Sequence, residues 1–294
     1  MRALIAALAL LAFTGPVALS ADPHAVLTLR PARGAATDLE IRGMIAGSAG
    51  DGVFYARWAD LRALPVEKIW VTDEFRPGSQ ELTVLFLSDL LVALPVTKGA
   101  DVVLATCNDQ YASVYRFDFI AQYRPFLVLE IDGKGPDQWP LPGMANDPGP
   151  YAILVSPVVV PDAANLLDLS HKKPWGVVAI ETRRFSEAFQ GVYVGRWATL
   201  SRRASEGRDI WINSCASCHP GPNSTFGGVK SGQPFAVLEA LAAGNPAFVK
   251  GYVRDPKSLN PNAKMEPHAY YSDAQLNALI AFILAEGPYA NEGH

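Results

Sequence analysis

Two cysteines and a histidine stand together in the stretch WINSCASCHPG, residues 211–221, and residues of these types at this spacing can do chemistry. Cys215 and Cys218 are separated by two residues, and His219 follows directly. Thiols so placed form a disulfide, a redox-active dithiol or two covalent bonds to a prosthetic group. A thioredoxin-like dithiol opens a helix after a strand, whereas the segment ASEGRDIWINSC that leads to Cys215 has the pattern of a helix.

The order Cys-x-x-Cys-His is the attachment pattern of a c-type haem. On a helical turn, two thiols with two residues between them face the same porphyrin edge, where each forms a thioether with a vinyl group. The adjacent His219 can then lie under the iron as the proximal ligand, since neutral imidazole suits iron. The sequence therefore predicts one covalently bound haem c, held by Cys215 and Cys218, with His219 on the metal.

A second axial ligand must come from another part of the chain, and methionine is a common partner of histidine on such iron. The candidates after the first residue are Met44, Met144 and Met265. Met265 lies downstream of the motif in NPNAKMEPHAYY, where a proline on either side limits motion. We therefore predict Met265 as the second axial ligand. His268 is the alternative, and a bis-histidine site would have a lower potential.

Two helices are expected to position these groups. One covers EGRDIWINSC, with Ser205 as its N-cap. The other is SDAQLNALIAFILAEG, which starts at Ser272 or Asp273, carries an apolar stripe and ends at Gly287.

With CASCH, the helix before it, the methionine loop and the closing helix, residues 199–294 resemble the class I cytochrome c fold. The resemblance implies a small all-α domain whose first and last helices cross where a small residue meets an aromatic, here Gly207 and Phe282. It also implies a proline carbonyl that accepts the Nδ1–H of the proximal histidine. Pro234 is the candidate for that role, in which it would make the imidazole a better donor.

The first residues, MRALIAALALLAFTGPVALSADP, have one positive charge, an apolar run, helix breakers and then small residues. This is the pattern of a secretory signal peptide, and we expect it at residues 1–21. An uncleaved anchor is the alternative, but the apolar run is shorter than the roughly 20 residues that a membrane span needs. We expect a soluble periplasmic protein without a membrane span. The formal net charge of −4 offers no basic surface for nucleic acid.

Residues 22–198 are predicted to form an α+β domain with mixed sheets. Short runs of apolar and β-branched residues that end at Gly, Pro or Asp predict strands. These runs lie at 36–46, 67–73, 100–107, 125–133, 149–157 and 175–185, and short helical turns are expected within 55–65 and 85–95.

The motifs DLRALP, LSDLL, CNDQYASVYRFD, RPFLVLEIDGK, GPYAILVSP and KPWGVVAIE follow one another over most of residues 40–185. Their order resembles the molybdopterin-binding core of the sulfite oxidase family. That family binds molybdenum through a cysteine between the first two motifs, and the interval VEKIWVTDEFRPGSQELTVLF has none. Cys107 lies in a later segment, where we expect a buried small apolar side chain. The resemblance therefore implies this fold without molybdopterin.

Three further features have two interpretations each. Asp109 and Tyr111 would face the cofactor in the sulfite oxidase family, or else serve as turn and packing residues. The basic cluster His171-Lys172-Lys173 would dock an acidic partner or an anionic substrate, or else form a solvated turn.

The sequence favours a carrier of single electrons between a partner dehydrogenase or oxidase and a respiratory acceptor, with residues 22–198 used for docking or ligand binding. One alternative is a single-chain oxidoreductase, similar to a sulfite dehydrogenase, that passes electrons from residues 22–198 to its own haem. Another alternative is a redox sensor. We expect a cytochrome subunit rather than a stand-alone enzyme.

Overall fold

The computed structural model describes residues 26–47, 52–167, 169–223 and 226–288. It shows a mixed α+β chain with two β-sheets, which confirms the coarse prediction of an α+β fold. The predicted signal peptide lies outside the described residues. Within them, no helix combines the length and the apolar character needed to cross a membrane.

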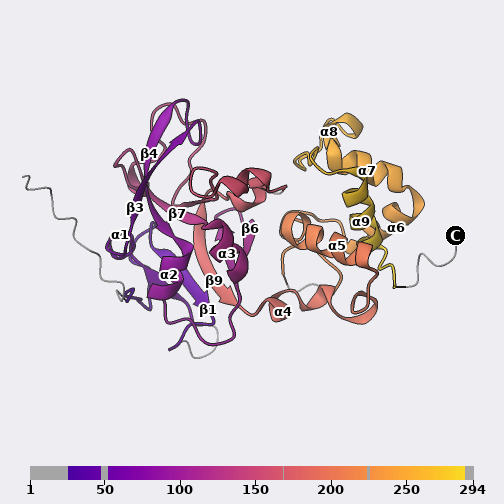
Figure 1. The fold of residues 1–294 in the computed structure, drawn as a ribbon, viewed down its shortest axis with the longest axis horizontal. Helices are drawn as coiled ribbons and strands as arrows, with labels where there is room; N and C mark the ends of the chain where they lie inside the picture. Colours follow the sequence, from indigo (N-terminus) through magenta and orange to yellow (C-terminus); the bar gives the residue numbers. More distant parts are fainter. Residues whose placement is uncertain (1–25, 48–51, 168, 224–225, 289–294) are drawn as a thin grey trace, which may run out of the picture.

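Figure 1 shows two lobes that follow one another along the chain, a β-rich part (residues 26–198) and a helical part (residues 199–288). The β-rich part holds a five-stranded sheet of order β2-β1-β9-β5-β6 and a four-stranded sheet of order β3-β4-β7-β8. β1 and β9 are parallel, and the other neighbours are antiparallel. The strands are β1 (Leu39–Gly43), β2 (Phe54–Ala56), β3 (Glu67–Thr72), β4 (Ser79–Phe86), β5 (Val102–Cys107), β6 (Ala112–Arg116), β7 (Phe126–Ile131), β8 (Ala152–Leu154) and β9 (Val177–Arg183).

Strands β1, β3, β5, β7, β8 and β9 lie inside the predicted stretches, because each is a short apolar run that a turn residue closes. The sequence reasoning missed β2, β4 and β6. β4 begins with the polar residues SQE, so only its pairing with β3 and β7 makes it a strand.

Three short helices connect strands of the β-rich part: α1 (Trp58–Arg62), α2 (Leu87–Ala93) and α3 (Phe117–Tyr123). A fourth, α4 (Phe185–Ala188), follows the last strand and leads to the helical part. α1 and α2 lie within the predicted helical stretches, whereas α3 and α4 were not predicted.

Successive side chains of a strand point to opposite faces of its sheet, and β5 uses both faces to bury apolar residues. Val103 and Ala105 belong to a core inside the β-rich part. Val102 and Leu104, together with Val114 of β6, belong instead to the core of the helical part. Both parts therefore bury apolar surface on one sheet, and this packing joins them.

All described elements of the helical part are helices: α5 (Arg202–Ile210), which continues as a π-helical turn (Trp211–Cys215), α6 (Phe235–Gly244), α7 (Pro246–Arg254), α8 (Pro256–Leu259) and α9 (Asp273–Ile283). The predicted N-cap of α5 is wrong, because the Oγ atom of Ser201, not Ser205, accepts the N–H of Ala204. Ser272 caps α9 as predicted and forms a capping box with Gln275.

α5 and α9 cross so closely that Gly207 has no room for a side chain. A Cβ atom built on Gly207 would lie 1.8 Å from the carbonyl oxygen of Ala278. The part of α9 nearest to Gly207 is therefore the backbone at Ala278, one turn before the Phe282 that we predicted. Phe282 packs on Trp211, with ring centroids 5.9 Å apart, because Trp211, the first residue of the π-helical turn, follows Gly207 by one turn.

We expect Gly207→Ala to lower the free energy of unfolding by about 1–3 kcal/mol, the usual cost of forcing extra atoms into a packed contact. Urea unfolding followed by circular dichroism measures the change. Gly244→Ala is the matched control, since a Cβ at this exposed position of α6 meets nothing within 4 Å. Equal stability of the two variants would contradict the close crossing.

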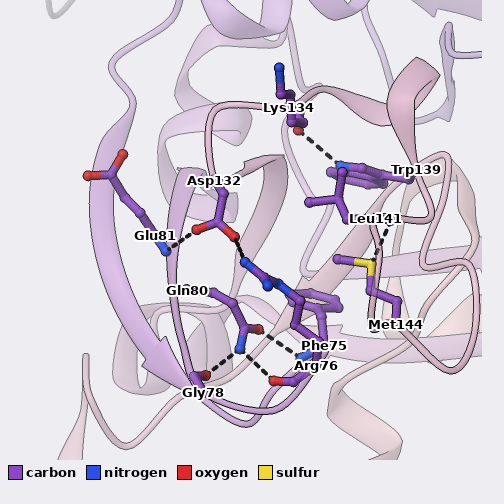
Figure 2. A network of polar contacts seen from close by, with 10 residues as sticks. All are labelled: Phe75, Arg76, Gly78, Gln80, Glu81, Asp132, Lys134, Trp139, Leu141 and Met144. Atoms are coloured by element: carbon purple, nitrogen blue, oxygen red, sulfur yellow. Dashed lines mark hydrogen bonds and ion pairs between the residues drawn. The ribbon is translucent and has the colours of Figure 1, made fainter.

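The tip of the β3–β4 hairpin is held by one buried amide, as Figure 2 shows. The Oε1 atom of Gln80 accepts the N–H of Phe75 at 3.1 Å. Its Nε2 atom donates to the carbonyl oxygens of Arg76 and Gly78. The side chain of Gln80 is fully buried, so water cannot replace these bonds.

Gln80→Ala should destabilise the chain by roughly 1–3 kcal/mol, because it leaves the N–H of the buried Phe75 without its acceptor. Thermal unfolding compared with the exposed Gln233→Ala control would reveal it. A melting temperature unchanged from the wild type would show that the hairpin does not depend on this amide.

Candidate functional site

The Cys-x-x-Cys-His motif forms one tight turn directly after α5. The π-helical turn ends at Cys215, and the backbone N–H groups of Cys218 and His219 both donate to the Cys215 carbonyl oxygen, at 3.1 and 2.8 Å. Neither cysteine is in a disulfide, and both are half-buried. The structure thus brings together the three residues that the sequence singled out.

A glycine loop folds back onto this turn, and the sequence reasoning missed it. Gly228 N–H donates to the Ala216 carbonyl oxygen at 3.0 Å, and Ser231 N–H donates to that of Cys218 at 2.8 Å. Gly227 has a φ of +81°, and a Cβ there would lie 1.7 Å from the Ala216 oxygen. The pair Gly-Gly in the sequence was the available signal, since glycine permits both the positive φ and the close approach.

His219 is half-buried, and one of its ring nitrogens is enclosed by the protein. Its Nδ1 atom is buried and has no hydrogen-bond partner among the described residues. Burial and the nearby His268 lower the pKa of His219, which favours the neutral imidazole that binds iron. Pro234 is exposed and begins α6, where its carbonyl oxygen accepts the N–H of Val237 at 3.0 Å. The role of Pro234 beside His219 stays a prediction.

The described methionines divide clearly between the two parts. Met44 follows β1, and Met144 lies near the β3–β4 hairpin, where its sulfur accepts the N–H of Leu141 at 3.3 Å (Figure 2). Met265 is half-buried in the loop between α8 and α9. It is therefore the methionine on the same part of the chain as the motif.

His268 lies in the loop of Met265 and is buried, with 6% of its surface exposed. Its backbone N–H donates to the Val253 carbonyl oxygen at 2.9 Å, which fixes this end of the loop to α7. Its Nδ1 atom lies 3.0 Å from the hydroxyl oxygen of Tyr270. The structure thus gives His268 an interior place near His219, not the surface position of an ordinary loop residue.

The motif faces the β5–β6 turn of the β-rich part. The Oγ atom of Ser217, between the two cysteines, accepts the buried N–H of Ala112 at 2.8 Å. Asp109 forms an ion pair with Lys230 of the glycine loop. Burial opposes ionisation of Asp109, but the Lys230 ammonium outweighs it and lowers the pKa of the carboxyl. Asp109 and Tyr111 therefore lie beside the motif, a proximity that the sequence did not predict.

The basic cluster is not a solvated turn, and that interpretation is wrong. His171 stacks on His268, with ring centroids 5.1 Å apart. Lys172 is 5% exposed, and its ammonium donates to the Asn213 side-chain oxygen at 2.9 Å. Lys173 pairs with Glu74 at 2.6 Å. Each of the three side chains thus has its own partner. His171 and Lys172 reach the helical part because the short 3₁₀ helix Leu169–Lys172 lies at the boundary of the two parts.

Cys107 is buried, as expected, in the core of the β-rich part. Burial, reinforced by the nearby Asp109, raises the pKa of its thiol to about 12, so Cys107 is an unreactive thiol. Within the part of the chain that the structure describes, no three His, Cys, Asp or Glu residues are grouped to hold a metal ion.

A cavity of about 390 Å³ also lies at the boundary of the two parts, with Arg116, Lys172 and Asp209 among its lining residues. Charges of both signs line it, and they pair within its walls, as Arg116 does with Asp118 at 3.4 Å. Its chemistry therefore selects no class of ligand.

No known family model matches the chain, and a search of curated proteins finds no match.

We expect Ser217→Ala to lower the free energy of unfolding by about 1–3 kcal/mol, the cost of leaving the buried Ala112 N–H without an acceptor. Chemical denaturation measures it. Ser258→Ala, which removes an exposed hydroxyl in α8, is the control. If both variants unfold like the wild type, the motif does not depend on the β5–β6 turn.

Proposed function

We propose that the chain is a periplasmic monohaem c-type cytochrome that carries single electrons between a partner oxidoreductase and a respiratory acceptor. The observation that carries this proposal is the single turn on which two thiols that form no disulfide lie together with one imidazole. The backbone bonds that Gly228 and Ser231 donate to Ala216 and Cys218 support it, because they hold this turn in place.

Each residue then has a distinct role. Cys215 and Cys218 would hold the porphyrin through thioethers, and His219 and Met265 would be the side chains that bind its iron. The haem, when bound, supplies a one-electron iron couple whose potential methionine raises. With both of these side chains on the iron, the group would serve electron transfer rather than bind a substrate.

The domain assignment belongs to the same proposal. Residues 199–294 are a class I cytochrome c domain, supported by the close crossing of α5 and α9 and by the capped closing helix. Residues 22–198 are a sulfite-oxidase-like domain without molybdopterin, supported by the order of its motifs and by the missing cysteine.

A second candidate function is favoured by one contact. Ser217, inside the haem motif, bonds to Ala112 at the β5–β6 turn, so the β-rich part reaches the site that holds the haem. A single-chain oxidoreductase that passes electrons from the β-rich part to its own haem would use this contact. Metal analysis separates the two candidates: iron alone supports the carrier, and stoichiometric molybdenum supports the oxidoreductase.

We expect the double variant Cys215→Ala and Cys218→Ala to lose covalent haem completely, because no other described thiol lies on the turn. Haem staining of a denaturing gel, after expression with a haem-attachment system, gives the readout. Cys107→Ala is the matched control and should stain like the wild type. A wild-type chain that carries no covalent haem in this assay would refute the proposal.

Met265→Ala should abolish the far-red sulfur-to-iron charge-transfer band of the oxidised protein and lower its reduction potential, because the axial sulfur is lost. Visible spectroscopy and a redox titration measure the two effects. Met144→Ala, in the β-rich part, should change neither. A band that survives in Met265→Ala would exclude this residue as the ligand. If only His268→Ala loses the low-spin iron, the second ligand of the iron is His268.

A further inference from the structure

Three side chains from distant positions in the sequence form a line across the boundary between the two parts. Tyr111 lies at the end of the β5–β6 turn, and His171 lies in the 3₁₀ helix Leu169–Lys172. His268 lies in the loop of the helical part that carries Met265. Two of the three therefore belong to the β-rich part, and the third belongs to the predicted axial-ligand loop.

The contacts along this line are polar and close. The Tyr111 hydroxyl oxygen and the Nδ1 atom of His171 are hydrogen-bonded at 2.9 Å. The Nε2 atom of His171 lies 3.4 Å from the Nδ1 atom of His268, and the two imidazoles stack at an interplanar angle of 18°. Burial raises the pKa of Tyr111, so its hydroxyl keeps its proton.

The β-rich part holds its two members rigidly. Tyr111 N–H donates to the Asp109 carboxylate at 3.0 Å, which fixes the turn. The hydroxyl of Ser113, on β6, donates to the His171 carbonyl oxygen at 2.6 Å. The next residue, Lys172, is buried and bonds to Asn213, two residues before Cys215. His171 is thus presented to the helical part from a fixed backbone.

We propose that Tyr111 and His171 are positioning residues for the axial-ligand loop: by holding His268, three residues after Met265, they keep the methionine sulfur on the iron. The inference rests on the proposed haem site. It gives the β-rich part a structural role in that site. This part would support the axial-ligand loop from outside the helical part, even if it binds no cofactor itself.

The physical reason is an equilibrium of the axial-ligand loop between a state in which Met265 binds the iron and a state in which it does not. The backbone bond from His268 to Val253 fixes the far end of the loop only through the helical part itself. Stacking and hydrogen bonding to His171 add a second anchor from a different part of the molecule. Their loss should allow Met265 to leave the iron more often, and external ligands then compete for the open position.

The test uses the full chain with its haem attached and measures how fast ferric iron binds cyanide. His171→Ala should bind cyanide about tenfold faster, the factor that corresponds to ~1.4 kcal/mol of lost interaction. Tyr111→Phe, which removes only the hydroxyl, should change the rate in the same direction but less. The reduction potential should fall in both variants, with the larger fall in His171→Ala.

Lys173→Ala is the matched control, because its side chain pairs with Glu74 inside the β-rich part and should leave rate and potential unchanged. In a double-mutant cycle, Tyr111→Phe should add little once His171 is alanine, since the two act in series. Circular dichroism confirms that each variant is folded, and Tyr111→Phe carries the test if His171→Ala is not.

The outcomes separate this inference from the proposed function. If the wild type holds covalent haem with the charge-transfer band, but both variants match it in cyanide rate and potential, the positioning role is refuted while the cytochrome stands. If the wild type has no covalent haem, the proposed function itself fails. If Lys173→Ala changes the rate as much as His171→Ala, the effect is general loosening and the positioning role is refuted.

Discussion

The close crossing of α5 and α9 at Gly207 is the contact on which the candidate site depends. A side chain at Gly207 would collide with the backbone at Ala278, so the two helices meet backbone to backbone. One turn later Trp211 packs on Phe282, and from there α5 continues without a break into the π-helical turn. The direction in which Cys215 leaves the helix is therefore set by a contact two turns before it.

The second constraint is the sheet that both parts share. Val102 and Leu104 of β5 lie in the core of the helical part, while their neighbours in the strand face the core of the β-rich part. Polar contacts also join the two parts, among them the hydrogen bond of Ser217 with Ala112 and the ion pair of Lys230 with Asp109. The Cys-x-x-Cys-His motif consequently lies where the two parts meet, and both parts supply the residues around it.

This arrangement changes how the β-rich part is understood. Under the proposed function this part carries no cofactor, so its attachment to the helical part needs another reason. The Leu169–Lys172 segment offers one, because His171 and Lys172 both reach the helical part from it. Under the same proposal, the β-rich part acts as a wall of the haem site as well as a surface for partners.

The sequence by itself determined the features that depend on near neighbours in the chain. The spacing of Cys215, Cys218 and His219, the capped start of α9 at Ser272 and six of the β-strands could be found there, because each is decided by a few consecutive residues. Tertiary structure alone decided the partner of Gly207 and the boundary position of His171. These were hidden because they join residues far apart in sequence, whose meeting depends on how whole helices and sheets pack and not on any local pattern.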